Sequence, residues 1–411
     1  MRALALVDTD SYVKWGAALL ARLPDSWERE VAVVATPGAP SADQLAAALA
    51  GSGFAGDGRV FPVDDAVARV VLERPDVVIV AMRGPAASVV LRLLADLPGR
   101  PVLVSGLPGI SIPATWKALF YRAQADLMVL HSRREVRAFG AVAAKRGWDH
   151  RLALATLPFI DRTPAPGGTD VVFAVQSIVP LPRADRERVL DILVATAERN
   201  PAHRVVIKVR AVDGEQQTHD EEHSYPDLLR ARRDVPANLV VASGAMSAAL
   251  DTAAGLVTVS STSAIEAIAR GVPVIALDEF GVSDELINPV FRGSGLFGDG
   301  EAVASLAFAA PSPEWLADNY FHPADDVDWM RALDDLLARR ASEGLPDRPS
   351  LRGHLGGLLR RAWERKQAFG EYDRSLLGLA ALAVGTPARA VVLFGRRLTR
   401  GRTHSWESPA P

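Results

Sequence analysis

Residues 257–278 read Val-Thr-Val-Ser-Ser-Thr-Ser-Ala-Ile-Glu-Ala-Ile-Ala-Arg-Gly-Val-Pro-Val-Ile-Ala-Leu-Asp, and this stretch decides the fold. It starts as an apolar strand, passes four hydroxyl residues, forms a short helix that Gly271 ends, and enters a second buried strand at Pro273. Strand, helix and strand in this order form one unit of a parallel α/β sheet. Open α/β sheets bind ligands at the carboxyl ends of their strands, so we expect the hydroxyl cluster to lie at a ligand site.

The hydroxyl cluster is predicted to hold a phosphate. Ser260, Ser261, Thr262 and Ser263 stand where unpaired backbone amides and the positive end of the helix dipole are expected. Such an arrangement binds a phosphate without any basic side chain. Ser263-x-x-Glu266 also matches a capping box, which needs only one of the four hydroxyls. We therefore predict a phosphate-binding loop that coexists with a capping box.

The composition describes a folded protein of more than one domain. The 411 residues exceed one ordinary hydrophobic core, and 49% hydrophobic with 23% charged residues suits a folded chain. A formal net charge of −3 gives no electrostatic case for a nucleic-acid partner. The absence of cysteine excludes disulfides, thiolate metal sites and a cysteine nucleophile. The N-terminal apolar run is too short for a signal peptide, so we expect a cytoplasmic protein.

The first 160 residues alternate between strand-like and helix-like segments. Continuous Val, Ile and Leu runs separated by amphipathic helices predict a parallel sheet that is covered on both faces. The predicted strands are residues 3–7, 31–35, 77–81, 102–105 and 127–130. The predicted helices are residues 15–22, 44–50, 67–73, 86–97, 116–124 and 134–146.

Prolines and glycines crowd into residues 161–169, which we predict as a linker. The alternation then restarts, which predicts an α/β chain of two Rossmann-like doubly wound domains, 1–160 and 170–312, with a ligand between them. The second domain is predicted from strands at 171–175, 204–209, 239–242, 256–259 and 272–277 and a helix at 185–198. Residues 313–411 are predicted as a helical C-terminal extension, with helices at 327–340, 351–366 and 376–398.

The last predicted helix is apolar and ends in a basic cluster. Interruptions in its apolar run argue against a membrane span. Two interpretations remain open: the helix packs back across the first domain, or it contacts the inner face of the plasma membrane. The interrupting residues are Gly378, Gly385, Pro387 and Arg389, and the basic cluster is Arg396, Arg397, Arg400 and Arg402.

Two such domains with a late hydroxyl loop, a helix glutamate and a Gly-x-Pro-Val-Ile strand resemble a GT-B glycosyltransferase. The chain is similar to an uncharacterised bacterial family of glycosyltransferases over about residues 1–310. This resemblance implies an enzyme that moves a sugar from a nucleotide-sugar donor to a polysaccharide or glycolipid acceptor, without a metal or another cofactor. The other segments that carry it are 8–16 (Asp-Thr-Asp-Ser-Tyr-Val-Lys-Trp-Gly), 106–110 (Gly-Leu-Pro-Gly-Ile), 131–135 and 208–219.

The donor nucleotide stays open between CMP and UDP. Bacterial sialyl-, polysialyl- and capsule transferases of this fold use a Ser-rich loop and a His-Pro motif for a cytidine nucleotide sugar. The Ser-rich loop matches here. The place of the His-Pro motif reads Lys208-Val-Arg210, and His322-Pro323 comes too late in the chain to replace it.

The leaving phosphate needs positive charge beside it. Lys208 and Arg210 alternate after a buried strand, so both are predicted on one side, facing the phosphate. His219 lies in a wholly polar loop and is predicted to donate to, or protonate, the same phosphate. Residues 219–223 also match the H-x-x-E-H zinc pattern, but no apolar residue interleaves them, so we expect no catalytic zinc site there. A divalent ion bound there without a catalytic role stays open. The resemblance implies that Glu266 accepts hydrogen bonds from the ribose.

Two carboxylates follow the first strand and are candidates for the base. Of Asp8 and Asp10 we choose Asp10, because Asp8 directly follows the apolar residues and is explained as a turn residue. Ser11 and Lys14 belong to the same acceptor-side segment. Lys14 either contacts an acidic acceptor or only covers the helix.

Further candidates follow other strand ends. Gly106 and Gly109 either let the backbone approach a ligand or form a simple tight turn. His131 is predicted to line the cleft, although Ser132-x-x-Glu135 also reads as a capping box. The resemblance implies that Asp278 and Glu279 contact the donor sugar.

Two other functions remain open. A nucleotide-sugar 2-epimerase has the same fold and needs no acceptor, and a non-catalytic protein would only bind a nucleotide or a glycan. A dinucleotide oxidoreductase is disfavoured because no G-x-G-x-x-G motif follows the first strand.

Overall fold

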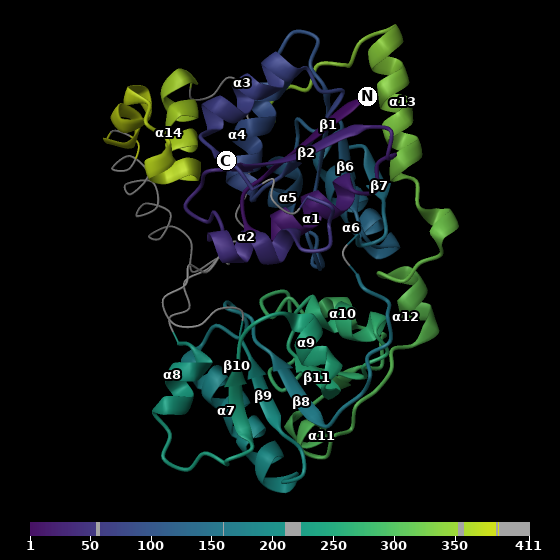
Figure 1. The fold of residues 1–411 in the computed structure, drawn as a ribbon, viewed down its shortest axis with the longest axis vertical. Coiled ribbons are helices and arrows are strands. Elements are labelled where there is room, and N and C mark those ends of the chain that lie inside the picture. Colours follow the sequence, from purple (N-terminus) through teal and green to yellow (C-terminus); the bar gives the residue numbers. More distant parts are fainter. Residues whose placement is uncertain (55–57, 159, 210–222, 352–356, 384, 386–411) are drawn as a thin grey trace.

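The computed structural model describes residues 1–411 except 55–57, 159, 210–222, 352–356, 384 and 386–411. The described residues form two α/β domains, one above the other in Figure 1, with a helical extension beside them. The predicted fold class is confirmed.

The first domain is built on a seven-stranded, all-parallel sheet in the order β3-β2-β1-β4-β5-β6-β7. The five predicted strands are present, whereas β3 and β7 are too short to show a hydrophobic period. The strands are β1 (Arg2–Val7), β2 (Glu28–Val34), β3 (Val60–Phe61), β4 (Val77–Ala81), β5 (Val102–Gly106), β6 (Leu127–Leu130) and β7 (Leu152–Leu154). The helices are α1 (Asp10–Leu20), α2 (Ala42–Leu49), α3 (Val63–Glu73), α4 (Gly84–Ala95), α5 (Trp116–Phe120) and α6 (Arg133–Arg146).

The second domain has a six-stranded parallel sheet in the order β10-β9-β8-β11-β12-β13. Its strands are β8 (Asp170–Ala174), β9 (Val205–Lys208), β10 (Leu239–Ala242), β11 (Ala253–Thr258), β12 (Val274–Leu277) and β13 (Phe297–Gly298). Its helices are α7 (Arg183–Arg199), α8 (Tyr225–Arg230), α9 (Met246–Asp251), α10 (Ser263–Ala269) and α11 (Gly300–Ala304).

Each sheet has one point at which the strand order reverses. In the first sheet β1 pairs with β2 on one side and β4 on the other, so that Ala5 lies opposite both Val31 and Ile79. In the second sheet the reversal lies between β8 and β11, whose register pairs Val257 with Phe173. The loops that follow these strands separate toward opposite faces of the sheet, which leaves a crevice for ligands at each reversal.

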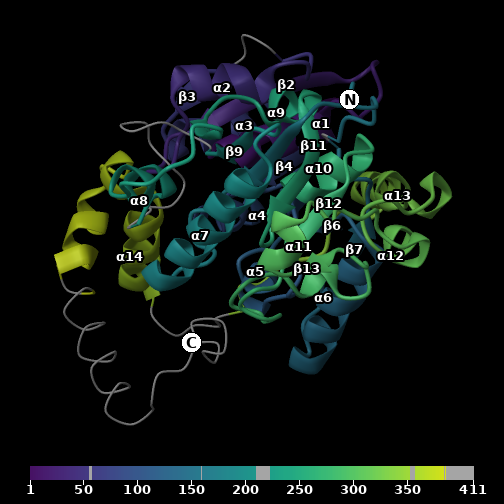
Figure 2. The same ribbon diagram turned by 90° about the horizontal axis from the view of Figure 1, so that it is seen from below.

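The extension returns from the second domain to the first. It contains α12 (Pro313–Asp318), α13 (Trp329–Ser342) and α14 (Gly357–Phe369). Leu333 of α13 joins the core on one face of the first sheet, and Phe369 at the end of α14 joins the core on the other. Both views show α13 and α14 on opposite sides of this domain (Figures 1 and 2). No helix in the described part of the chain is both long and apolar enough to cross a bilayer.

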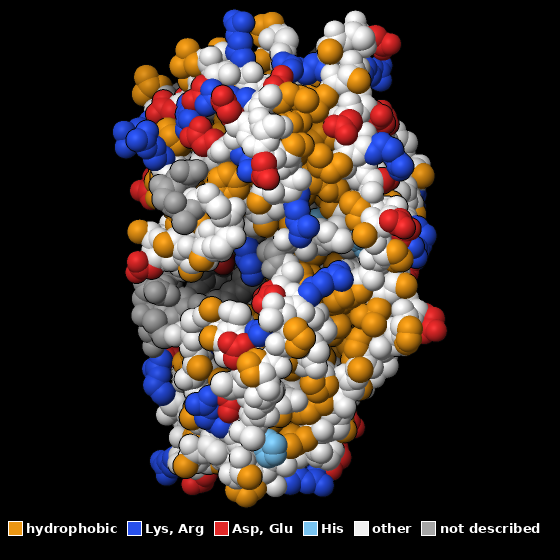
Figure 3. All heavy atoms as spheres, turned by 45° about the vertical axis from the view of Figure 1, so that its right-hand side comes forward, with side chains coloured by type: hydrophobic (Ala, Val, Ile, Leu, Met, Phe, Trp, Pro, Cys, Tyr) orange, Lys and Arg blue, Asp and Glu red, His pale blue; other side chains and the backbone are white. Residues whose placement is uncertain are grey.

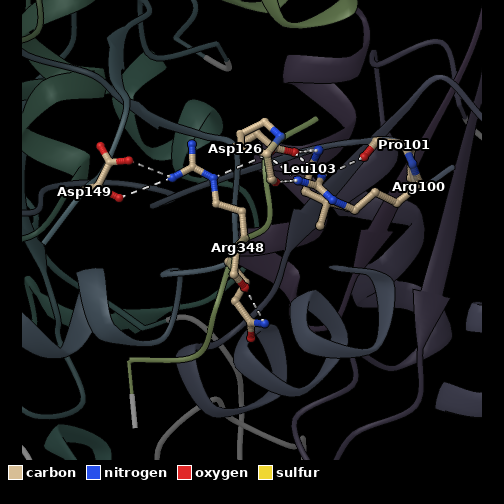
Figure 4. Close-up of polar contacts among 8 residues, drawn as sticks. Arg100, Pro101, Leu103, Asp126, Asp149 and Arg348 are labelled. Atoms are coloured by element: carbon tan, nitrogen blue, oxygen red, sulfur yellow. Dashed lines mark hydrogen bonds and ion pairs between the residues drawn. The ribbon is translucent and has the colours of Figure 1, made fainter. Parts of the chain in front are cut away.

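A buried ion pair fixes this extension to the first domain (Figure 4). Arg100, just before β5, donates to the two carboxylate oxygens of Asp126 at 2.6 and 2.9 Å. Arg348, between α13 and α14, places its Nε 3.5 Å from the same carboxylate. The Leu103 amide donates to Asp126 at 2.9 Å, and the Asp126 side chain has no exposed surface. A charge buried in this way must keep its partners.

Candidate functional site

The carboxyl edges of the two sheets face each other between the domains. Lys14 of α1 and Glu266 of α10 form an ion pair across this boundary, with Nζ 3.7 Å from Oε2. Figure 3 shows the surface indented between the two domains. We call the space between the loops that follow β1, β4, β5, β8 and β11 the interdomain crevice.

Asp8 lies at the reversal point of the first sheet and is fully buried. Both of its carboxylate oxygens accept from the backbone amide of Arg83, at 3.2 and 3.1 Å, and the Arg83 Nε lies 3.7 Å away. Burial raises the pKa of Asp8 to about 6, against the opposing effects of Arg83 and Arg122. Asp8 thus fixes the loop after β4 rather than opening into the crevice.

Asp10 is the first residue of α1 and is half-buried. The Ser11 hydroxyl lies 3.4 Å from its Oδ1. A carboxylate in the first turn of a helix is favoured by the helix dipole, which accounts for Asp10 structurally but leaves its side chain partly accessible. Asp10, Ser11 and Lys14 therefore lie on one stretch of α1 that begins at the crevice.

A buried arginine that the sequence did not single out ties these loops together. Arg122 donates to the Gly106 carbonyl at 2.9 Å, to the Tyr12 hydroxyl at 2.7 Å and to the Met82 carbonyl at 3.0 Å. A Cβ at Gly106 would lie 2.5 Å from the Trp15 indole. The expectation that a ligand approaches at Gly106 is wrong, because the Trp15 ring takes that space.

His131 is a core residue. It has no exposed surface, and its Nε2 accepts from Trp15 Nε1 at 2.6 Å. Its Nδ1 lies 3.2 Å from the Ala155 carbonyl, which fits a neutral ring protonated on Nδ1. Burial lowers the pKa of His131 to about 4. The prediction that His131 lines the crevice is wrong, since Trp15 closes that face of the imidazole.

Glu135 connects three parts of the chain. Its carboxylate accepts from the amides of His131 and Ser111, both at 2.9 Å, and from the hydroxyl of Tyr320 in the extension at 2.6 Å. Burial raises the pKa of this carboxyl. Only half of the expected capping box exists: Ser132 caps α6, whereas the carboxylate of Glu135 binds other partners.

The loop after β5 touches the second domain directly. A Cβ at Gly109 would lie 2.6 Å from Oγ1 of Thr262, and the Ile110 amide lies 3.4 Å from the same oxygen. Ile112 belongs to the same apolar cluster as Ile265 of α10. Gly109 is therefore needed for the contact between the domains.

Three of the four amides of the hydroxyl loop have protein acceptors. Ser260 donates through its amide and its hydroxyl to Gln176 Oε1, at 2.9 and 3.0 Å. The Ser261 amide donates to Oγ1 of Thr258 at 3.1 Å, and the Ser263 amide donates to Oγ of Ser261 at 3.2 Å. The prediction of a loop of unpaired amides is wrong at these three positions, because neighbouring side-chain oxygens satisfy them.

The predicted capping box at this loop is also wrong. α10 begins at Ser263 with Thr262 as its N-cap, and the Thr262 side chain makes no capping hydrogen bond. Among the described residues no acceptor is found for the Thr262 amide. Glu266, which was expected to close the box, faces Lys14 instead. The Thr262 hydroxyl and Glu266 thus face the first domain at the reversal point of the second sheet. The hydroxyls of Ser260 and Ser261 donate to acceptors within the second domain.

Of the three residues predicted to face the leaving phosphate, the structure describes only Lys208. Lys208 is buried and donates to the carbonyls of Val209 at 2.8 Å and Gly244 at 2.6 Å, so its ammonium closes the ends of two strands. The prediction that it faces a phosphate is wrong for this reason. Arg210 and His219 lie outside the described residues. Within the described ranges, no group of three acidic or histidine side chains is placed to hold a metal ion.

Of the two acids after β12, Glu279 serves local structure through its side chain, and Asp278 does so through its backbone carbonyl. Glu279 pairs through Oε1 with Arg188 of α7 at 2.8 Å and accepts through Oε2 from the Gly300 amide at 2.9 Å. The carbonyl of Asp278 accepts from the Gly281 amide at 2.7 Å in a turn. Glu279 therefore joins α7 to α11, and its expected contact with a donor sugar would require these bonds to break.

Two residues at the reversal points were missed. Arg83 lies two residues after the end of β4, and Gln176 lies two residues after the end of β8. The rule applied to Lys208, that polar residues after a buried strand lie at the ligand edge, could have found both.

Comparison with known proteins places this geometry in a family. The profile of the family described as "Putative glycosyltransferase (DUF6716)" matches residues 3–336. A Listeria monocytogenes structure described as a "putative UDP-N-acetylglucosamine 2-epimerase" is similar with a TM-score of 0.53 and 14% identity, and the match covers 85% of this chain and 98% of the other. The Methanocaldococcus jannaschii UDP-GlcNAc 2-epimerase has a TM-score of 0.52 and 8% identity, and the match covers 82% of this chain and 100% of the other. Anabaena HepE with UDP and glucose has a TM-score of 0.51 and 13% identity, with 83% of this chain and 100% of the other covered. The sequence search found no match among curated proteins.

Proposed function

Since the chain belongs to the DUF6716 family of GT-B glycosyltransferases, we propose that it transfers a sugar from a nucleotide-sugar donor to a polysaccharide or glycolipid acceptor. The observation that carries this proposal is that the strand-order reversal of the first sheet lies opposite that of the second sheet. The Lys14–Glu266 pair, 3.7 Å long, places the start of α1 opposite the start of α10, so that a donor on one side would meet an acceptor on the other.

The proposed donor is a UDP-linked sugar held by the second domain. UDP or a UDP-sugar occupies the M. jannaschii epimerase and HepE structures, which share this fold. The hydroxyls of Ser261, Thr262 and Ser263 would donate to the leaving phosphate, together with the Thr262 amide. Glu266 would accept hydrogen bonds from the ribose once it leaves Lys14. Donors aimed at a leaving phosphate stabilise the charge that grows on it in the transition state.

Asp10 is the proposed base. In the reaction the acceptor oxygen forms a bond to the anomeric carbon while the bond from that carbon to the phosphate oxygen breaks. The nucleotide diphosphate leaves with the bonding electrons, and the acceptor proton passes to the Asp10 carboxylate. Asp10 suits this role better than Asp8, because Asp10 is half-buried at the crevice and Asp8 has no exposed surface.

The donor site is tested by replacing Ser261 and Thr262 together with Ala and titrating UDP by calorimetry. We expect UDP affinity to fall at least about tenfold, since each lost hydrogen bond to a charged group is worth about 1.5–3 kcal/mol. Ser342→Ala, an exposed position on α13, is the control. Unchanged UDP affinity in a folded double variant would show that the donor binds elsewhere. Stabilisation of the wild type by NAD but not by UDP or CMP would overturn the proposed function.

The base is tested with Asp10→Asn, with Asp43→Asn on the exposed start of α2 as the control. We expect UDP affinity to persist and turnover of UDP-sugar to fall at least about 100-fold. Full turnover in D10N would remove Asp10 from the mechanism. Release of a C2-epimerised sugar without any acceptor, seen by NMR, would favour the 2-epimerase alternative instead.

The acceptor is further proposed to lie at the inner face of a membrane. Exposed leucines on the last described helices support this: their exposed fractions are 73% for Leu358, 52% for Leu359, 83% for Leu376, 47% for Leu377 and 51% for Leu379. Apolar side chains beside arginines are typical of helices that bind anionic lipid surfaces. Leu358→Ser with Leu376→Ser should reduce co-sedimentation with phosphatidylglycerol vesicles. Equal sedimentation of variant and wild type would contradict this contact.

A further inference from the structure

Arg83 is a cation at the reversal point of the first sheet whose side chain has no hydrogen-bond acceptor among the described residues. Its side chain is 33% exposed, and its Nε is buried without a hydrogen bond. The ion pair with Asp8, at 3.7 Å, is longer than a hydrogen bond. The Arg122 guanidinium, by contrast, donates to three carbonyls and to the Tyr12 hydroxyl; the carbonyls are those of Gly106, Ala118 and Met82.

Packing holds the Arg83 guanidinium in one place. A Cβ at Gly38, in the loop after β2, would lie 2.8 Å from Nη2 and 2.9 Å from Cζ of Arg83. The guanidinium therefore lies against the Gly38 backbone on one side and near the Asp8 carboxylate on the other. The loops after β1, β2 and β4 thus together hold the Arg83 guanidinium at the crevice edge of the first domain.

The charges around Arg83 come from both signs of side chain. Asp8 is buried behind the guanidinium and offsets part of its charge. Asp10 starts α1 on the same edge, and Lys14, one turn further on, pairs with Glu266. A planar guanidinium with five N–H donors suits a carboxylate or a phosphate, which it binds through two parallel hydrogen bonds. A neutral hydroxyl would use only part of this donor set.

We propose that Arg83 binds an anionic group of the acceptor, so that the enzyme glycosylates a substrate carrying a phosphate or a carboxylate near the receiving hydroxyl. This inference rests on the proposed function, in which the first domain holds the acceptor. A phosphorylated lipid or sugar and an acidic sugar share the oxyanion that Arg83 recognises. The two sources are separated by experiment.

The test compares three small probes by titration calorimetry: glucose, glucose 1-phosphate and glucuronate. UDP is present at saturation, so that an anionic probe cannot use the phosphate site of the second domain, and the series is repeated without UDP. We expect the wild type to bind at least one anionic probe about tenfold or more tightly than glucose. Arg83→Gln should abolish this preference, and Arg59→Gln, an exposed arginine of the same domain, should keep it.

Two variants test separately whether the positive charge of Arg83 is needed and whether its position is needed. Arg83→Gln keeps the hydrogen bonds to Asp8, because the backbone amide makes them. Gly38→Ala keeps the positive charge but pushes the guanidinium aside, so it should also weaken the preference for the anionic probe. Unaltered melting temperatures of both variants would show that the fold is retained.

Each outcome decides the proposal. Preference for glucose 1-phosphate alone assigns a phosphorylated acceptor, and preference for glucuronate alone assigns an acidic sugar. The proposal fails if neither anionic probe binds the wild type better than glucose at millimolar concentration, or if the preference survives in R83Q. It also fails if R83Q loses UDP affinity instead, which would place Arg83 at the donor. Failure of the wild type to bind UDP at all would refute the proposed function separately.

Discussion

Asp8→Asn should change how the stability of the protein depends on pH. Asp8 is fully buried beside the Arg83 amide, and burial raises its pKa from 3.8 to about 6. A carboxyl whose pKa is higher in the folded than in the unfolded chain favours folding when protonated. Its contribution is therefore present at low pH and is lost as the pH rises through about 6.

The size of the effect follows from the two pKa values. The difference between 3.8 and about 6 corresponds to about 3 kcal/mol between fully acidic and neutral conditions. Within a range in which the protein stays folded, from pH 8 to pH 5, protonation of Asp8 should add about 1.4 kcal/mol to the free energy of unfolding. The asparagine side chain in the variant would keep an oxygen to accept from the Arg83 amide and would not titrate.

The assay is urea denaturation of wild type and D8N at pH 5 and pH 8, followed by tryptophan fluorescence. The variant should be more stable relative to wild type at pH 8 than at pH 5, by about 1.4 kcal/mol. Other titrating groups cancel in this comparison because both proteins contain them. A difference between the two proteins that is the same at both pH values would show that Asp8 ionises like an exposed carboxyl, and the argument from burial would be wrong.

Three further predictions use the same denaturation assay. Asp126→Asn breaks a buried ion pair and should cost about 3–5 kcal/mol, whereas Asp335→Asn in an exposed pair should cost less than about 1 kcal/mol; equal costs would contradict the role of burial. Tyr320→Phe removes one hydrogen bond to the buried Glu135 carboxylate and should cost about 1.5–3 kcal/mol, and a neutral result would mean that the carboxylate does not need it. His131 has its pKa lowered to about 4 by burial, so the wild type should lose about 1.4 kcal/mol per pH unit from pH 6.5 toward pH 4 relative to His131→Gln. Parallel pH profiles would refute that assignment.

The sequence predicted strands better than it predicted what polar residues do. β4, β6 and β10 have the expected bounds, because each is a continuous apolar run between turn residues. β4 and β6 are buried throughout, whereas β10 is a partly exposed edge strand. α1 begins at Asp10, earlier than the expected residue 15, since its polar first turn carries no apolar period. The placing of the hydroxyl loop at a strand end followed from the same pattern.

The roles of Lys208, His131 and Gly106 could not be read in the same way. Each stands at the end of a buried strand or directly after it, where a ligand residue could also stand. Two backbone carbonyls, however, accept from Lys208, and the Trp15 indole donates to His131 and fills the space beside Gly106. The sequence pattern predicts that a polar residue stands at the sheet edge, but it does not predict which group that residue contacts. Its partner comes from a loop far away in the chain, such as the one that brings Trp15 to both Gly106 and His131.

The order of apolar and polar residues alone determined the two parallel sheets, the polar residues at the ends of their strands and the helices of the extension, because these depend on local periodicity. Only the tertiary structure decided which residues at the sheet edge face the crevice and which are buried in contacts with other protein groups. Asp8 and Arg83 are 75 positions apart, and only the pairing of β1 with β4 makes them neighbours. Burial raises the pKa of Asp8, and packing against Gly38 fixes the position of the Arg83 guanidinium. Both effects depend on contacts between segments that are distant in the sequence.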